Sequence, residues 1–198
     1  MQKLFLPIAL LASTIGVAQA QQPANTIGIK AGYGITSLSG TSPGYTSVNH
    51  AAYQAGLMGD LYLTEVVSIH PELLYTKQYF DATDLLKKSR DVDYINLPVT
   101  VRYHAGGLYF EAGPEVNFTL TAVDEDKRDV KSRDMTPVVL NYVVGLGYEL
   151  PMGLSANICY DGGISHTYKT SAEDHLGEGN LRASTFWFGL GYAFGASK

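Results

Sequence analysis

The chain has 198 residues, 14 of them Lys or Arg and 19 Asp or Glu, which gives a formal charge of −5 at pH 7. That length fits one domain and is short for two. A mildly acidic chain without a basic block argues against nucleic acid as a partner, and the only cysteine, Cys159, excludes an internal disulfide.

The chain begins with the pattern of a secretory signal peptide. Lys3 provides a positive charge, residues 4–17 are mostly apolar, and Ala18-Gln19-Ala20 has the A-x-A form of a cleavage site. We therefore expect export, a signal peptide of residues 1–20 and one mature domain of residues 21–198. After the signal peptide no segment has eighteen uninterrupted apolar residues, so we expect no helical membrane span.

Eight runs in the rest of the chain alternate apolar and polar residues, which is the period of a β-strand with one apolar face. The fourth contains YINLPVTVRY, residues 94–103, in which every second residue from Ile95 to Tyr103 is apolar. The runs cover residues 26–36, 51–63, 66–79, 92–104, 107–121, 137–149, 153–168 and 182–195.

Long and short connections alternate between these runs. Four are long and polar, and three are short turns with the expected Gly and Pro. Eight strands joined in this way predict an all-β fold, an eight-stranded antiparallel up-and-down barrel. The long connections are residues 37–50, 80–91, 122–136 and 169–181, and the short turns lie at 64–65, 105–107 and 150–153.

The apolar face of the strands is too bulky for the inside of an eight-stranded barrel, which a few side chains fill. The opposite face is rich in glycine, which leaves room for long polar groups in a narrow lumen. We therefore predict that the apolar face points outward into lipid, with aromatic residues near both water interfaces. The alternative is a secreted β-sandwich in which the aromatic residues form an ordinary core.

The predicted lumen face collects ionisable and amide side chains. They could form a path for a ligand or an ion. The alternative, a polar core filled by paired charges, is favoured because channels need many more strands and an isolated buried charge is costly. The predicted polar network contains Lys30, Asp60, Glu72, Asn96, Arg102, Glu111, Glu115, Glu149 and Asp161, with Asn117, Asn141 and Asn157 between them.

Ser68, His70 and Glu72 share one face of the third strand and suggest a catalytic triad. Residues two apart on a strand lie about 6.6–6.8 Å apart, whereas a triad needs contacts near 3 Å. We therefore expect that the three do not act in a line, and we predict no catalytic residue. Outer-membrane lipid A deacylases do carry a His and a Ser two apart on a strand, but theirs meet lipid, whereas this face points to the lumen.

The sequence gives no metal or cofactor pattern. The acidic residues of the third long loop alternate with basic ones and lack the glycine-punctuated spacing of a calcium loop. The histidines His50, His104, His166 and His175 lack metal-ligand spacing. Cys159 faces the lumen, where we expect a small buried side chain.

Four prolines fall inside the predicted strands, although a proline cannot donate to a β-ladder and a closed barrel has no free edge. We expect a bulge or a locally irregular bond at each. They are Pro71, Pro98, Pro114 and Pro137.

The fourth and fifth runs resemble a known family. Residues 94–103 fit the form Y-[IL]-x-[IL]-P-[LV]-x-[LV]-[KR]-Y, and Gly-Gly-Leu-Tyr-Phe-Glu-Ala-Gly-Pro at 106–114 also fits. Both segments resemble the outer membrane β-barrel domain family related to PorT, a group of OmpX-like eight-stranded barrels, and the resemblance covers nearly the whole mature chain. It implies the outer membrane of a diderm bacterium, surrounded by lipid and lipopolysaccharide.

The expected function is that of a small, non-enzymatic outer-membrane barrel with a filled polar lumen, structural or interacting through its outer loops. The resemblance also implies a first alternative, a component or assembly factor of an envelope protein-secretion system with envelope protein partners. A lipid A-modifying outer-membrane enzyme is a second alternative.

Overall fold

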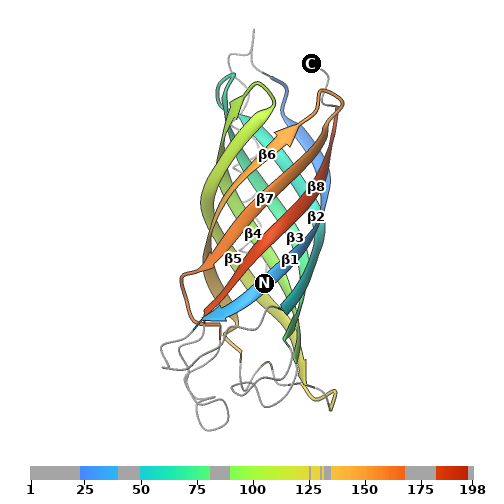
Figure 1. Ribbon diagram of the computed structural model, residues 1–198, viewed down its shortest axis with the longest axis vertical. Helices are drawn as coiled ribbons and strands as arrows, with labels where there is room; N and C mark the ends of the chain where they lie inside the picture. The colour runs from blue at the N-terminus through green and yellow to red at the C-terminus, as the bar shows by residue number, and fades with distance from the viewer. Residues whose placement is uncertain are drawn as a thin grey trace, which may run out of the picture.

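The computed structural model of the chain describes residues 23–39, 50–80, 90–124, 126–129, 131, 135–167 and 182–195. These residues form eight antiparallel strands, and β8 pairs with β1 to close a barrel (Figure 1). The predicted fold class is therefore confirmed. The strands are β1 (Thr26–Ser39), β2 (His50–Tyr62), β3 (Val67–Phe80), β4 (Arg90–Ala105), β5 (Leu108–Asp124), β6 (Val138–Glu149), β7 (Leu154–Gly163) and β8 (Arg182–Phe194).

The observed strands depart from the predicted runs mainly at the end with the long connections. β7 ends at Gly163 rather than at 168, because the backbone N–H groups of Ile164 and Ser165 both turn back to the carbonyl of Leu140. The pairing of β4 and β5 shifts by one residue next to Tyr94. This bulge moves the buried face of β5 from odd-numbered to even-numbered residues, a change that a strict period of two does not predict.

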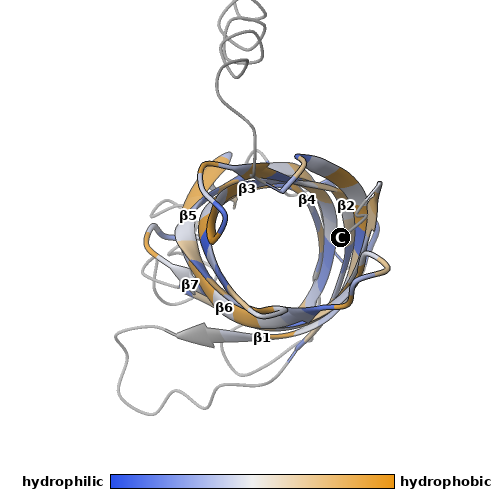
Figure 2. Ribbon diagram, turned by 90° about the horizontal axis from the view of Figure 1, so that it is seen from above, coloured by the Kyte–Doolittle hydropathy of each residue, from blue (hydrophilic) through white to orange (hydrophobic). Residues whose placement is uncertain are grey.

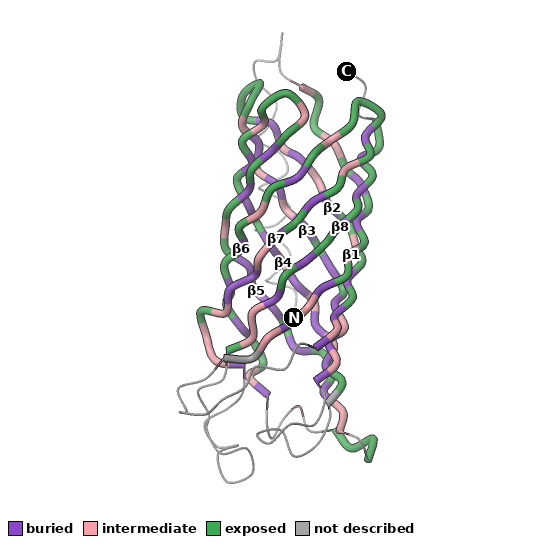
Figure 3. Tube along the Cα trace, in the orientation of Figure 1, coloured by how far each residue is buried: buried purple, intermediate pink, exposed green. Residues whose placement is uncertain are grey.

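The barrel is apolar outside and polar inside, as predicted. Exposed and buried residues alternate along each strand, and the barrel forms a closed ring when it is seen along its axis (Figures 2 and 3). Val101 and Leu190 are 55% and 63% exposed on the outer face, whereas Lys30 and Arg102 are buried inside. Only a lipid environment tolerates this arrangement. Among the described residues, no helix is long and apolar enough to cross a membrane.

Each strand pairs with a neighbour on both sides, and three strand prolines interrupt the pairing on one side while they keep a partner on the other. Pro71 pairs with Val99 of β4, but the pairs expected opposite it on β2 are missing. Pro98 keeps its partner on β5 and loses the pairs toward β3, and Pro114 keeps Tyr142 of β6 and loses those toward β4. The register is unchanged on both sides of each gap, so the irregular bonding is confirmed and there is no bulge at these sites.

The fourth proline lies outside the strands, so the prediction that places Pro137 inside a strand is wrong. Pro137 precedes β6, which begins at Val138, so it takes no place in the ladder. Its carbonyl accepts the backbone N–H of Thr119 at 3.0 Å and joins the end of β6 to β5.

Candidate functional site

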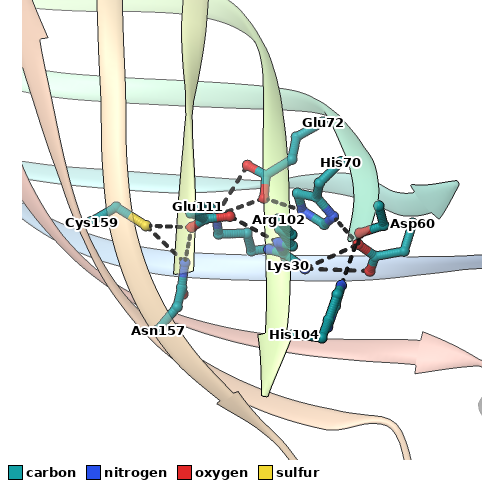
Figure 4. A network of polar contacts seen from close by, with 10 residues as sticks. Lys30, Asp60, His70, Glu72, Arg102, His104, Glu111, Asn157 and Cys159 are labelled. Carbon is teal, nitrogen blue, oxygen red and sulfur yellow. Dashed lines mark hydrogen bonds and ion pairs between the residues drawn. The ribbon is translucent and has the colours of Figure 1, made fainter. Parts of the chain in front are cut away.

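An ion pair links two strands that are not neighbours in the barrel. The Nζ atom of Lys30 on β1 lies 2.8 and 3.0 Å from the two carboxylate oxygens of Glu72 on β3 (Figure 4). The strand between them, β2, presents Gly56 opposite Lys30. A Cβ atom on Gly56 would overlap the backbone of Leu73 on β3, so this glycine lets β2 and β3 approach closely, while a Cβ atom on Gly189 of β8 would lie 3.2 Å from the Cε atom of Lys30.

His70 continues this contact toward β2. Its Nε2 atom lies 2.8 Å from Oε1 of Glu72, and its Nδ1 atom lies 3.0 Å from Oδ1 of Asp60. The Ser68 hydroxyl donates to the same Asp60 oxygen and lies 2.9 Å from Nε2 of His104. The imidazole therefore bridges two carboxylates.

This geometry corrects part of the sequence argument. We expected the spacing of two residues to keep the side chains apart, but Nε2 of His70 lies only 2.8 Å from Oε1 of Glu72. Ser68 bonds Asp60 and His104, so the three residues still do not form a Ser–His–Glu line. Ser68, His70 and His104 join this site although none of them belonged to the predicted polar network; the even positions of Ser68 and His70 had placed both on the lumen face with Glu72.

Arg102 of β4 extends the network to β5. Its Nη1 atom donates to both oxygens of Asp60 at 3.3 and 3.4 Å, and its Nε atom donates to Glu111 at 2.9 Å. The guanidinium also lies over the ring of Tyr109, 4.2 Å from its centre, a favourable arrangement for a cation. Arg102 is 3% exposed, so the free-energy cost of burying its charge has to be offset by these partners.

Glu111 carries the network on to β7. Its Oε1 atom accepts bonds from the Sγ of Cys159 at 2.9 Å and from the amide of Asn157 at 3.4 Å. The thiol is thus a hydrogen-bond donor as well as the small buried side chain that we expected. Contacts run without a break from β1 through β3, β2, β4 and β5 to β7, across the lumen (Figure 4).

The remaining predicted network residues lie elsewhere in the lumen. Glu115 and Asp161 are buried nearer the long connections, where they accept bonds from the amide of Asn141 at 3.3 Å and from the indole N–H of Trp187 at 2.7 Å. Asn96 is buried at the same end of the barrel. Glu149 is the last residue of β6 and only half-buried, at the rim next to a short turn. The predicted residues therefore form a central network, a group nearer the long connections and one rim residue.

The described residues contain no group of three or more His, Cys, Asp and Glu side chains able to hold a metal ion. In the third long connection, Asp124 and Asp129 accept the backbone N–H groups of Arg128 and Lys131 at 2.9 Å. These carboxylates stabilise their own loop and do not converge. His175 and part of this loop lie outside the described residues.

The family of the chain follows from comparison with known sequences. Residues 7–194 match the family described as outer membrane protein beta-barrel domain. The chain belongs to this family. As an outer membrane β-barrel protein, it is located in the outer membrane of a diderm bacterium. No curated protein matches its sequence.

Solved structures share the fold of this outer membrane barrel at low sequence identity. The crystal structure of Neisserial surface protein A superposes with a TM-score of 0.64 at 11% identity, over 86% of this chain and 99% of that one. Ail, the attachment invasion locus protein of Yersinia pestis, superposes with a TM-score of 0.53 at 13% identity, again over 86% of this chain and 99% of that one. That Ail structure contains the heparin analogue sucrose octasulfate.

Proposed function

We propose that this outer-membrane barrel is a non-enzymatic protein with a closed lumen, which acts through its outer loops or as a structural part of the envelope. The observation that carries the proposal is the unbroken set of contacts from Lys30 on β1 to Cys159 on β7. A polar network of this kind fills the cross-section through which a solute would have to pass.

The free space next to the network supports a closed lumen. Two cavities on the side of the long connections have volumes of about 10 and 20 Å³. Volumes of that order hold single water molecules, whereas a solute path requires a continuous channel. Barrels of eight strands have interiors that side chains fill, and aqueous channels are found in much larger ones.

The positions of the candidate catalytic residues disfavour a lipid A-modifying enzyme. Ser68 and His70 are 0% and 1% exposed, and both lie on the lumen side of the barrel wall. The acyl chains of a lipid substrate would lie on the opposite face. The imidazole nitrogens are also both engaged by carboxylates, so neither is available to activate the serine hydroxyl.

The surfaces left for partners are the apolar outer face and the long connections. The outer face contacts lipid, and at the outer leaflet we propose that it contacts lipopolysaccharide. In the described part of the third connection, residues 126–129 are exposed. We assign interaction with other envelope or extracellular molecules to this end of the barrel.

A role in an envelope secretion system, as the resemblance to the PorT group implies, uses the same end of the protein. The two functions differ in what the barrel binds: a large envelope complex in one case, and lipid or an extracellular molecule in the other. Co-purification of a stoichiometric envelope complex would favour the secretion role.

The experiment is chemical cross-linking on intact cells, followed by purification of the tagged barrel. Replacement of residues 126–131 by Gly and Ser should remove the cross-linked partner. Lys30→Met/Glu72→Met, which changes only the lumen, should retain it as long as the barrel folds. Loss of the partner in the folded lumen variant but not in the loop variant would contradict the proposal.

A further inference from the structure

The larger of the two lumen cavities lies between the central network and the long connections. It has a volume of about 20 Å³. The lining comes from several strands and is almost wholly polar. The lining residues that bear on its chemistry are Asn96, Asn117, Asn141, Asp161 and Thr185.

Three amide oxygens in this lining lack a hydrogen-bond partner. They are the Oδ1 atoms of Asn96, Asn117 and Asn141, whose residues are 3%, 7% and 8% exposed. Asn96 pairs directly with Asn117 across β4 and β5, so their side chains are neighbours on the lumen face. The Asn141 amide nitrogen donates to Glu115, which identifies its other atom as the free acceptor. Buried acceptors without a partner are rare and need an explanation.

The charge balance of the described lumen gives a second, independent indication. Five carboxylates are buried there, against Lys30, Arg102 and the imidazole of His70, which lies between two of them; the carboxylates belong to Asp60, Glu72, Glu111, Glu115 and Asp161. The salt bridges of both basic residues go to Glu72, Asp60 and Glu111. Glu115 and Asp161 accept bonds from the neutral groups of Asn141 and Trp187. The lining of the larger cavity contains Asp161 and no Lys, Arg or His.

We propose that this cavity binds a monovalent cation, with the amide oxygens of Asn96, Asn117 and Asn141 and the carboxylate of Asp161 as ligands. One cation would satisfy three unpartnered acceptors and stabilise the ionised form of the buried Asp161 carboxylate. A water molecule has two protons, so it could donate to only two of the three oxygens.

The donor set and the volume select the class of cation. Carboxylate and carbonyl oxygens suit hard cations rather than transition metals, which prefer imidazole or thiolate ligands. Calcium takes six to eight oxygens, commonly with several carboxylates, and only one carboxylate lines this cavity. The volume of about 20 Å³ is of the order that holds one water molecule or an ion of similar size. The site therefore fits an alkali cation or ammonium. This inference does not depend on the proposed function.

The first test is the stability of the full-length barrel, refolded in lipid vesicles and unfolded by urea. Chlorides of potassium, sodium and rubidium are compared with N-methylglucamine chloride at equal ionic strength. At a cation concentration tenfold above the dissociation constant, the folding equilibrium constant should rise about 11-fold over the N-methylglucamine value. Equal stability in all four salts would overturn the proposal.

Variants of the lining residues test whether the stabilisation by alkali cations arises at this cavity. Asp161→Asn keeps an acceptor for the Trp187 indole but removes the charge, and Asn141→Leu removes one proposed ligand. Both variants should lose the preference for the small cation, that is, the higher stability in alkali chlorides than in N-methylglucamine chloride. Asn157→Ala, in the central network, should be less stable in every salt and keep the preference. A preference that survives in Asp161→Asn and Asn141→Leu would exclude this cavity as its origin.

A direct measurement complements the stability data. Crystals grown in rubidium chloride should show an anomalous scattering peak within ligand distance of Asn96, Asn117 and Asn141. Electron density at this position without an anomalous signal would indicate an ordered water only and would contradict cation binding.

Discussion

Glu111 on β5 and Cys159 on β7 are in contact across a strand that lies between them. The Sγ atom lies 2.9 Å from the Glu111 carboxylate, and Gly145 of β6 is the register partner of both residues. A Cβ atom on Gly145 would lie 2.8 Å from the sulfur and 3.0 Å from the carboxylate oxygen. Gly189 of β8 likewise leaves room for the network, because a Cβ atom there would lie 3.2 Å from the Cε atom of Lys30.

We therefore predict that Gly145→Ala destabilises the folded barrel. The added methyl group would overlap the contact between Glu111 and Cys159, and overpacking of this kind costs about 1–3 kcal/mol. The measurement is the urea midpoint in lipid vesicles. Gly59→Ala is the matched control, because its Cβ would meet only the carbonyl of Thr26, at 3.1 Å. An equal or smaller cost for Gly145→Ala would contradict this account of the network.

A second prediction concerns the ion pair of Lys30. Lys30→Met leaves the buried carboxylate of Glu72 without its cation, and breaking a buried pair costs about 3–5 kcal/mol. Adding Glu72→Gln should recover part of that loss, as a double-mutant cycle would show.

The control for this experiment is a pair on the same barrel that is not buried. Lys77 and Asp91 lie 3.7 Å apart and are partly exposed, so Lys77→Met should cost less than about 1 kcal/mol. If Lys30→Met cost no more than Lys77→Met, the central network would not hold the lumen together.

A third prediction tests the two faces of β4. Val99 is 47% exposed on the outer face and Thr100 is 2% exposed in the lumen. Val99→Arg places a charge in lipid and should cost about 2–4 kcal/mol near mid-bilayer. Thr100→Val should change stability little, since the Thr100 hydroxyl is buried without a partner and its replacement removes an unsatisfied group. Unfolding in vesicles measures both, and a larger loss for Thr100→Val would mean that the faces are assigned wrongly.

A fourth prediction fixes the orientation in the membrane. Lys127 and Arg128 are exposed in the third long connection, whereas Lys30 and Arg102 are buried in the lumen. With the long connections outside the cell, trypsin added to intact cells should cut near these two residues and leave both halves in the membrane. A carboxy-terminal tag accessible to antibodies on unbroken cells would reverse this topology, because an even number of crossings returns the chain to its starting side.

Strand periodicity predicted which residues face the lumen but not which of them touch. Lys30 and Glu72 lie on strands that are not adjacent in the barrel, and on β2 the register partner of Lys30 is Gly56 whereas that of Glu72 is Met58, so their contact depends on the reach of the lysine side chain. The backbone separation of about 6.6–6.8 Å between residues two apart does not predict the contact of His70 with Glu72, because the two side chains close that gap to 2.8 Å. The bulge at Tyr94 and the intact register around Pro98 are properties of paired strands, so a single run of sequence contains no signal for them.

Closure of the lumen by polar side chains can be measured as the electrical conductance of the purified, folded protein in planar lipid bilayers. We expect no discrete conductance steps for the wild-type protein, because the contacts from Lys30 to Cys159 cross the lumen without a break. Stable, ohmic steps in proportion to the amount of folded wild-type barrel would contradict it.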